Sequence, residues 1–249
     1  MMISARLPAP FGLISLDSVG STNDEARRLA QSGAAADFLV VSAESQSAGR
    51  GRRGRAWVSP AGNLHFSLLI RIQSLSSAAQ LGFAAAAALV SALSTLLPQG
   101  QFQAKWPNDV MAAGRKCAGM LLESAGTDWL VLGIGVNVVA APPPVGLNHP
   151  ACALADLGFS GTADDVLAAF CTDFLPLVQA WRGQGFAPVR QAWLNCARGL
   201  GQPTVVRLET DTQTGIFAGL DEEGALLLDQ GASGFRRILA GDVFFPDAR

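Results

Sequence analysis

The sequence predicts an α+β protein, in which a large domain that mixes strands and helices precedes a small β-barrel. Strand-like and helix-like apolar patterns share the first 200 residues. The segment Gly199-Leu200-Gly201-Gln202-Pro203 interrupts them, and five short apolar runs separated by Asp, Glu and Gly turns follow. Closely spaced short strands are typical of small barrels. We therefore divide the chain into residues 1–200 and residues 201–249.

The first part of the large domain contains short strands and one helix. Strands are predicted over residues 11–16, 38–43 and 63–71, and a helix over residues 24–31. Thr22-x-x-Glu25 has the spacing of a capping box, which would open this helix, and Gly33 ends it. Apolar and polar residues alternate along the third strand, which predicts a half-buried strand.

The second part contains a long Ala-rich helix, predicted over residues 76–97, whose small side chains allow close packing on a sheet. Further strands are predicted over residues 101–105, 116–123 and 129–134, and helices over residues 163–181 and 186–197. Three consecutive prolines exclude regular structure between Ala140 and Pro150. The five runs of the small domain cover residues 204–208, 214–218, 225–228, 235–239 and 243–245.

Composition narrows the class of protein. Hydrophobic residues make up 49% and charged residues 15% of the chain, as in a globular protein with a sizeable core. The net charge of −2 argues against a protein that coats nucleic acid. Four cysteines without C-x-x-C spacing and only two histidines argue against a redox motif, a zinc site or a multi-histidine metal centre.

The sequence contains no evident targeting or membrane segment. The N-terminus lacks a long apolar core, and the apolar run Leu81–Leu97 carries hydroxyl residues that fit a buried helix better than a membrane span. We therefore expect a soluble, cytoplasmic protein without membrane attachment.

The most unusual stretch is Ser45–Trp57, which reads SQSAGRGRRGRAW. Its four arginines stand among three glycines and no acid. Guanidinium groups match phosphate and carboxylate oxygens, and glycines let the backbone approach a ligand. Because like charges at this density repel, we expect the run to be loose until an anion neutralises it. Taken alone, it fits a flexible anion clamp, a solvated basic loop or a nucleic-acid-binding patch.

Polar side chains cluster at three strand ends. Gln46 and the basic run follow one predicted strand, residues 105–109 follow a second, and Lys116 opens a third. Several cations together with Asp109, an acid suited to hold Mg²⁺ against phosphates, indicate a site that activates a phosphate-bearing ligand. The chain has no P-loop motif, and Gly133-x-Gly135 is too short for a dinucleotide fingerprint.

Four motifs in this order resemble the biotin protein ligase family. They are Gly49-Arg50-Gly51-Arg52-Arg53-Gly54-Arg55 with Trp57, Lys105-Trp106-Pro107-Asn108-Asp109, Arg115-Lys116-x-x-Gly119 and Gly133-x-Gly135-x-Asn137. The resemblance covers essentially the whole chain, because Gly219-Leu220-Asp221-x-x-Gly224-Ala225-Leu226 in the small domain also fits. A single block would be weak evidence, but four blocks at compatible spacing are specific.

The resemblance implies a mixed-sheet biotin/lipoate-ligase-like catalytic domain followed by an SH3-like barrel. It also implies a two-step reaction that uses ATP, Mg²⁺ and biotin. Biotin and MgATP would give biotinyl-5′-AMP and pyrophosphate, and a lysine of a biotin carboxyl carrier protein would then take the biotinyl group. The carrier would belong to acetyl-CoA carboxylase or a related carboxylase.

The resemblance also assigns roles to residues by motif. The biotin-binding residues would be Ser21, Thr22, Asn23, Gln46, Arg50, Gly51, Arg52, Lys116, Gly119 and Gly133. The residues that bind ATP or the adenylate would be Arg50, Arg52, Arg55, Trp57, Lys105, Asn108, Asp109, Gly135 and Asn137. Lys116 and Arg52 would be catalytic, with Lys116 bridging the biotin carboxylate and the α-phosphate. Asp109 would hold Mg²⁺.

The chain departs from relatives in two ways. Repressor-type relatives carry an N-terminal helix-turn-helix module, whereas here the first predicted strand starts ten residues after Met1, so we expect no DNA-binding module. In some relatives an aromatic residue after the Gly-x-Gly strand covers the adenine, and residues 140–150 contain none. Both a monomer and a homodimer are compatible with the sequence.

Two other functions compete with biotin ligation. A lipoate–protein ligase would share the fold and the adenylate chemistry, but its apolar dithiolane needs no polar ring pocket. A non-catalytic nucleic-acid-binding protein would use the basic run, but the acidic balance of the chain and the presence of Lys116 and Asp109 argue against it.

Overall fold

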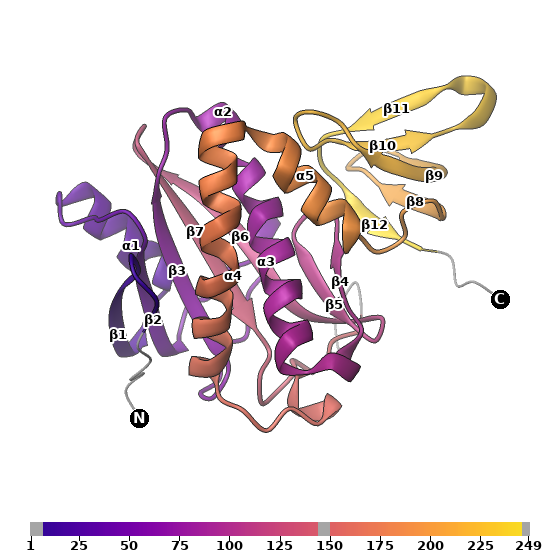
Figure 1. Cartoon of the computed structure of the whole chain (residues 1–249). Coiled ribbons are helices and arrows are strands. Elements are labelled where there is room, and N and C mark those ends of the chain that lie inside the picture. The colour runs from indigo at the N-terminus through magenta and orange to yellow at the C-terminus, as the bar shows by residue number, and fades with distance from the viewer. Residues whose placement is uncertain (1–6, 144–149, 246–249) are drawn as a thin grey trace.

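The computed structural model describes residues 7–143 and 150–245 (Figure 1). Within these residues the larger sheet has seven strands in the order β1-β2-β3-β7-β6-β5-β4. Their bounds are β1 Gly12–Val19, β2 Leu39–Gln46, β3 Leu64–Arg71, β4 Phe102–Lys105, β5 Asp109–Ala112, β6 Arg115–Ala125 and β7 Trp129–Val136. β1 and β2 pair in parallel, and the other neighbouring strands pair antiparallel. The predicted mixed sheet is confirmed.

Helices cover both faces of this sheet. They are α1 Thr22–Gln31, α2 Leu75–Ala78, α3 Gln80–Leu96, α4 Ala163–Gln184 and α5 Phe186–Asn195. α3 and α4 cross in front of the strands in Figure 1, and α1 packs against β3 and β7 from the other face. The core is divided accordingly into a large cluster under α3 and α4 and a small cluster under α1. The small cluster contains Ala26, Leu29, Val41, Leu69 and Val131.

The central strand β3 differs from its prediction. It was expected to be half-buried, but every residue from Leu64 to Ile70 is buried. The alternation is present, yet its polar positions face a second covered layer instead of solvent. Ser67 hydrogen-bonds to the first turn of α1, which lies over that face.

Several other boundaries also differ. β1 and β2 continue through residues predicted as turn and loop, and β5 was not predicted at all. The long Ala-rich helix is interrupted at Ala79, between α2 and α3. The predicted capping box is wrong, because Ser21 is the N-cap and makes no side-chain cap bond. The Thr22 hydroxyl instead donates a hydrogen bond to the side-chain oxygen of Gln46, so it does not cap the helix.

The small domain is a five-stranded antiparallel sheet in the order β11-β10-β9-β8-β12. Its strands are β8 Pro203–Arg207, β9 Thr212–Leu220, β10 Leu226–Asp229, β11 Phe235–Ile238 and β12 Asp242–Phe244, one for each predicted run. The domain shares the core of the large one, where Trp193 of α5 packs edge-on against Phe217. In addition, the Trp106 indole donates a hydrogen bond to the Gly224 carbonyl at 3.2 Å.

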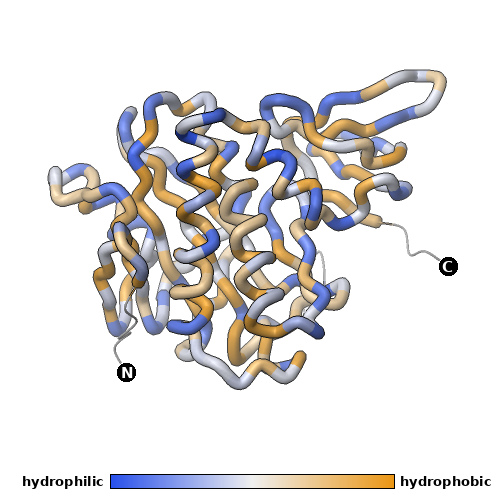
Figure 2. The backbone as a smooth tube through the Cα atoms, in the orientation of Figure 1, coloured by the Kyte–Doolittle hydropathy of each residue, from blue (hydrophilic) through white to orange (hydrophobic). Residues whose placement is uncertain are grey.

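The hydrophobic sequence lies mainly along the strands of the large sheet and on the helices that cover it (Figure 2). One helical stretch, Leu75–Leu96, is apolar enough by composition to span a membrane, with a mean hydropathy of 1.6. However, 67% of its most apolar window is buried inside the protein. The prediction of a core helix is therefore confirmed.

The packing of α4 on β3 leads to a stability prediction. Phe170 is fully buried, with its ring centroid 5.0 Å from that of Phe174 and 5.3 Å from that of Phe66. Phe170→Ala should lower the free energy of unfolding by about 3–5 kcal/mol in chemical denaturation, because it leaves a cavity. The matched control is Phe235→Ala, whose side chain is 67% exposed and which should change stability by less than about 0.5 kcal/mol. Equal losses in the two variants would contradict the described core.

Candidate active site

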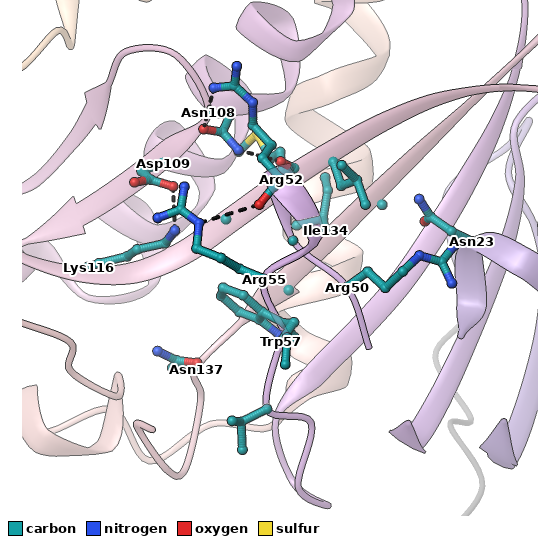
Figure 3. Close-up of a pocket in the computed structure, with 18 of the residues that line it drawn as sticks. Asn23, Arg50, Arg52, Arg55, Trp57, Asn108, Asp109, Lys116, Ile134 and Asn137 are labelled. Atoms are coloured by element: carbon teal, nitrogen blue, oxygen red, sulfur yellow. Dashed lines mark hydrogen bonds and ion pairs between the residues drawn. The ribbon is translucent and has the colours of Figure 1, made fainter. Parts of the chain in front are cut away.

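One cavity opens over β6 and β7, between the first turn of α1, the end of β2 and the segment Gly49–Arg55, which we call the arginine segment (Figure 3). All residues assigned to a site from the sequence line it, namely Ser21, Thr22, Asn23, Gln46, Arg50, Gly51, Arg52, Arg55, Trp57, Lys105, Asn108, Asp109, Lys116, Gly119, Gly133, Gly135 and Asn137. Other lining residues were not predicted from the sequence, namely Ala56, Val58, Phe66, Pro107, Met120, Leu121, Ile134, Pro142, Ala151 and Asp242.

One end of the cavity is polar and uncharged, and its side chains are held in fixed orientations. The backbone N–H and the hydroxyl of Thr22 both donate to Gln46 Oε1, at 2.8 and 3.1 Å. Gln46 Nε2 donates to the Ser59 hydroxyl at 2.9 Å. Because both ends of the amide are engaged, the Gln46 side chain can turn over only at the loss of these bonds. This end therefore presents a preorganised set of donors and acceptors.

Asn23 is fixed in the same way. The buried Ser67 hydroxyl lies 2.5 Å from Asn23 Oδ1 and 2.8 Å from the Thr22 hydroxyl. Asn23 Nδ2 donates to Glu123 Oε2 at 2.7 Å. Ser67 and Glu123 were not predicted, because nothing in their local sequence indicates that they lie beside α1.

Glycines form the floor of the cavity. Gly119 of β6 pairs in register with Gly135 of β7. A Cβ atom on Gly135 would lie 2.4 Å from the indole ring of Trp57, and one on Gly133 would lie 2.2 Å from Asn23 Oδ1. These contacts are far inside van der Waals range, so the site requires glycine at both positions.

Lys116 and Asp109 form an ion pair at the other end, with 2.5 Å between Lys116 Nζ and Asp109 Oδ1 (Figure 3). The ammonium also lies 5.5 Å from the ring centroid of Trp57, a cation–π arrangement. The backbone fixes Lys116 as well. Its N–H donates to the Pro150 carbonyl at 2.7 Å, and its carbonyl accepts from the Cys152 N–H at 3.0 Å.

Two more cations belong to this end. Lys105 is buried, and burial lowers its pKa to about 8, against the opposing effect of Asp109. Burial also lowers the pKa of Arg52, which nevertheless stays charged. Arg52 donates to Asn108 Oδ1 at 3.3 Å, and Asn108 Nδ2 donates to the Met120 carbonyl at 2.6 Å. The cavity thus holds more positive than negative charge close to Lys116.

Three acids pair with the arginine segment, namely Asp24 of α1, Glu123 of β6 and Asp242 of β12. Arg50 makes two bonds of 2.6 Å to Asp24, and this contact lowers the pKa of Asp24. Arg53 and Arg55 both pair with Asp242 of β12, at 3.2 and 3.5 Å. The segment was expected to be loose without an anion, and the acids that order it here were not predicted. Partly exposed pairs of this kind are worth up to about 1 kcal/mol each, so they hold the segment without locking it.

The turn after β7 has its own support. Asn63 Oδ1 accepts the N–H groups of residues 138–140 at 2.9, 2.9 and 3.1 Å, and Asn63 Nδ2 donates to the Ala140 carbonyl at 2.8 Å. This turn joins Asn137 to Pro142, which both line the cavity. The described parts of the predicted 140–150 loop have no regular structure. Residues 144–149 lie outside the described residues. The structure therefore does not test how the predicted 140–150 loop, which has no aromatic residue, would contact an adenine.

Metal binding was predicted for Asp109 alone. In the described part of the chain, no three His, Cys, Asp or Glu residues are grouped to hold a metal ion. Mg²⁺ in nucleotide sites uses one or two carboxylates together with the phosphates. Asp109 and Asp242 both line the cavity, so the donor set fits a cation that arrives with phosphate and does not fit a resident metal.

This geometry defines a site for an elongated ligand that is uncharged at one end and anionic at the other. Comparisons with known proteins identify the family. Residues 16–137 match the Biotin/lipoate A/B protein ligase family, and residues 199–245 match the Biotin protein ligase C terminal domain. The chain therefore belongs to the biotin/lipoate protein ligase family.

Relatives extend this similarity over nearly the whole chain. The Biotin–[acetyl-CoA-carboxylase] ligase of Paracoccus denitrificans is 41% identical over an alignment of 239 residues, and the match covers 90% of this chain and 97% of that protein. The enzyme of the same name from Mycobacterium tuberculosis is 35% identical over 90% of this chain and 85% of that protein. The bifunctional ligase/repressor BirA of Bacillus subtilis is 32% identical over 93% of this chain and 73% of that protein.

Solved structures share the fold. The biotin protein ligase of Aquifex aeolicus in complex with biotin and ATP has a TM-score of 0.82 at 27% identity, and the match covers 94% of this chain and 99% of that chain. The biotin protein ligase of Leishmania major in complex with biotin has a TM-score of 0.66 at 23% identity, covering 97% of this chain and 100% of that one. The predicted ligase fold with its small C-terminal β-domain is confirmed.

The glycine floor leads to a second prediction. Gly135→Ala should lower the free energy of unfolding by about 1–3 kcal/mol, because the new methyl group must displace the rigid Trp57 ring. Gly183→Ala in α4 is the matched control, since a Cβ there meets nothing within 4 Å. Alanine should stabilise that helix by about 0.5–1 kcal/mol. Denaturant titrations of both variants measure the difference, and equal effects would contradict the close approach of Trp57 to β7.

Proposed function

We propose that this chain is an ATP-dependent ligase that activates biotin as biotinyl-5′-AMP and transfers the biotinyl group to a lysine of a biotin carboxyl carrier protein. The observation that carries the proposal is that one cavity joins a preorganised uncharged end to a cluster of cations around Lys116. Relatives that match almost the full length of the chain carry the name Biotin–[acetyl-CoA-carboxylase] ligase. A carboxylase carrier domain is therefore the proposed acceptor.

The uncharged end suits the ureido ring of biotin. Such a ring offers a carbonyl acceptor and two N–H donors, and Thr22, Asn23 and Gln46 supply complementary groups. Each NH₂ group of Asn23 and Gln46 has a second hydrogen left for a ligand, and a site rejects analogues that leave such capacity unpaired. Lipoate, with its apolar dithiolane, would leave them unpaired. Although the family includes lipoate ligases, this end of the cavity favours biotin. Ser21, Gly51, Gly119 and Gly133 complete the proposed biotin site.

Lys116 is proposed to hold the reacting groups together. A carboxylate oxygen of biotin attacks the α-phosphorus of ATP, an O–P bond forms, and the bond to pyrophosphate breaks with its electron pair leaving on pyrophosphate. The two reactants repel each other, so an ammonium that contacts both lowers the barrier by positioning and charge neutralisation. Mg²⁺ bound with ATP would neutralise phosphate charge, and Asp109 would hold it once Lys116 turns to the substrates.

The arginine segment is proposed to cover the adenylate. Arg50 and Arg52 would move from Asp24 and Asn108 onto the anionic intermediate, at a modest energetic cost because the Arg50–Asp24 pair is partly exposed. Closure would exclude water from a mixed anhydride that hydrolyses readily. The remaining proposed contacts with the nucleotide come from Arg55, Trp57, Lys105, Asn108, Gly135 and Asn137.

In the second step, the neutral amine of a carrier lysine attacks the acyl carbon and forms a C–N bond, AMP leaves with the electron pair of the broken C–O bond, and the nitrogen loses a proton to solvent. We propose that residues 1–200 carry this chemistry, that residues 201–249 contribute Asp242 to the cavity, and that the enzyme works in the cytoplasm. A homodimer stays a prediction.

A direct assay tests the function. Purified protein mixed with biotin and MgATP should release pyrophosphate, and adding a biotin carboxyl carrier domain should give a carrier heavier by one biotinyl group in mass spectrometry. Lipoate in place of biotin should give no release above background. Pyrophosphate release with lipoate alone, or none with either acid, would overturn the proposal.

Removing the Lys116 ammonium tests its role. Lys116→Ala should lower the rate of pyrophosphate release at least about 100-fold, because a charge-stabilising donor in the transition state is lost. Lys116→Arg keeps the charge in a different shape and should recover only part of the rate. Circular dichroism should show that both variants are folded. A rate close to that of the unmodified enzyme in the alanine variant would remove Lys116 from the reaction.

Lys105 predicts a pH dependence. Its pKa in the free enzyme is about 8, so the side chain loses its charge as the pH rises through that value. The kcat/KM for ATP reports groups of the free enzyme and should therefore fall above about pH 8. Lys105→Met has no charge to lose. This variant should show a lower kcat/KM for ATP at pH 7, and its kcat/KM should not fall further above about pH 8. Identical profiles for the two proteins would rule out Lys105 as a nucleotide contact.

A further inference from the structure

Glu123 links Asn23 of the uncharged end to Arg50 of the arginine segment. It lies on β6 and does not line the cavity. Its Oε2 atom accepts from Asn23 Nδ2 at 2.7 Å and lies 3.5 Å from a terminal nitrogen of Arg50. Its Oε1 atom pairs with Arg27 of α1 at 2.8 Å. One carboxylate oxygen therefore serves both a residue of the uncharged end and a residue of the arginine segment.

The surrounding contacts set the orientation of the Asn23 amide and of the Glu123 carboxylate. Ser67 engages Asn23 Oδ1, so Asn23 must point its NH₂ group toward Glu123. Arg27 holds the second carboxylate oxygen, which fixes the plane of the Glu123 carboxylate. An amide nitrogen has two hydrogens, and Glu123 takes one of them, so the second can serve a ligand. A ligand acceptor on Asn23 would thus bind a side chain whose orientation Glu123 sets.

We propose that Glu123 is a positioning residue that couples occupation of the uncharged end to ordering of the arginine segment. The proposal rests on the function proposed above, in which biotin contacts Asn23 and the nucleotide contacts Arg50. A ligand acceptor bound to Asn23 would further restrict the motion of Asn23 and of the shared carboxylate about this orientation, so Arg50 would have less freedom left to lose when the second ligand arrives. Energetic coupling of this kind is reciprocal and needs no large movement.

Asp24 provides the matched control. It holds Arg50 through two bonds of 2.6 Å, a closer contact than that of Glu123, but its described hydrogen bonds and ion pairs are with arginines and none is with Asn23. Removing the Asp24 charge therefore loosens Arg50 without disturbing the uncharged end. A general need to anchor Arg50 and a specific link through Glu123 can be told apart in this way.

The test measures biotin affinity by titration calorimetry, with and without the non-hydrolysable analogue α,β-methylene-ATP. The wild-type protein should bind biotin more tightly when the analogue is present. Glu123→Gln keeps the shape but cannot serve all three donors, so it should weaken biotin binding about tenfold and reduce the enhancement by the analogue to about twofold or less. Asp24→Asn should keep the biotin affinity of the free enzyme within about twofold and retain most of the enhancement.

A double variant shows whether Glu123 acts through Arg50. In an Arg50→Gln background, Glu123→Gln should still weaken biotin binding but should change the enhancement no further. Glu123→Gln with unchanged biotin affinity and unchanged enhancement would overturn the proposal. So would an Asp24→Asn protein that loses the enhancement to the same extent as Glu123→Gln. Failure of the proposed function is distinguishable, because the wild-type protein itself would then not bind biotin. Thermal unfolding of each variant confirms that folded proteins are compared.

Discussion

The ion pair between Lys116 and Asp109 is the interaction on which this site depends. Lys105, Lys116 and Arg52 face the same small volume, and three cations so close together repel strongly where water is scarce. Burial lowers the pKa of Lys105 to about 8, and repulsion from Lys116 acts in the same direction. Asp109 neutralises only part of the charge. The remaining positive charge can be satisfied by anions, so an affinity for phosphate and carboxylate is built into the protein before any ligand arrives.

The sheet makes this arrangement possible because it carries the charged end and the uncharged end on one rigid surface. β6 and β7 supply Lys116 together with the glycine floor, and their pairing fixes Gly119 opposite Gly135. The arginine segment enters from the end of β2 and is held partly by Asp242 of the small domain. The small domain is therefore part of the site, since two arginines of the segment take their counter-ion from it.

The sequence predicts the parts of the site that lie in contiguous motifs. Fixed spacing within each motif places those residues at strand ends and turns, independently of contacts with distant parts of the chain. Ser67, Glu123 and Asp242 were missed for the opposite reason. Each reaches the site through pairing with residues distant in sequence, and none stands in a distinctive local pattern. The half-buried prediction for β3 failed similarly, because alternation reports a difference between two faces and cannot show that α1 covers the polar one.

β5 and the start of α1 show a second limit. The four residues of β5 are too few for a periodic signal, and they are a strand because β4 and β6 flank them. At α1, the capping pattern at Thr22 was present in the sequence, but Gln46 from β2 took the hydroxyl. A local rule gave way there to a contact that forms the ligand site.

The loop between β7 and residue 150 is tied at both of its ends. Where the loop leaves the sheet, Asn63 accepts hydrogen bonds from three consecutive backbone N–H groups. Where the chain returns, the backbone of Lys116 hydrogen-bonds to residues 150 and 152. These hydrogen bonds hold the two ends of the loop in place, so a change between them does not act directly on the Lys116 side chain. The stretch between them can therefore change in length and composition without moving the backbone that carries Lys116.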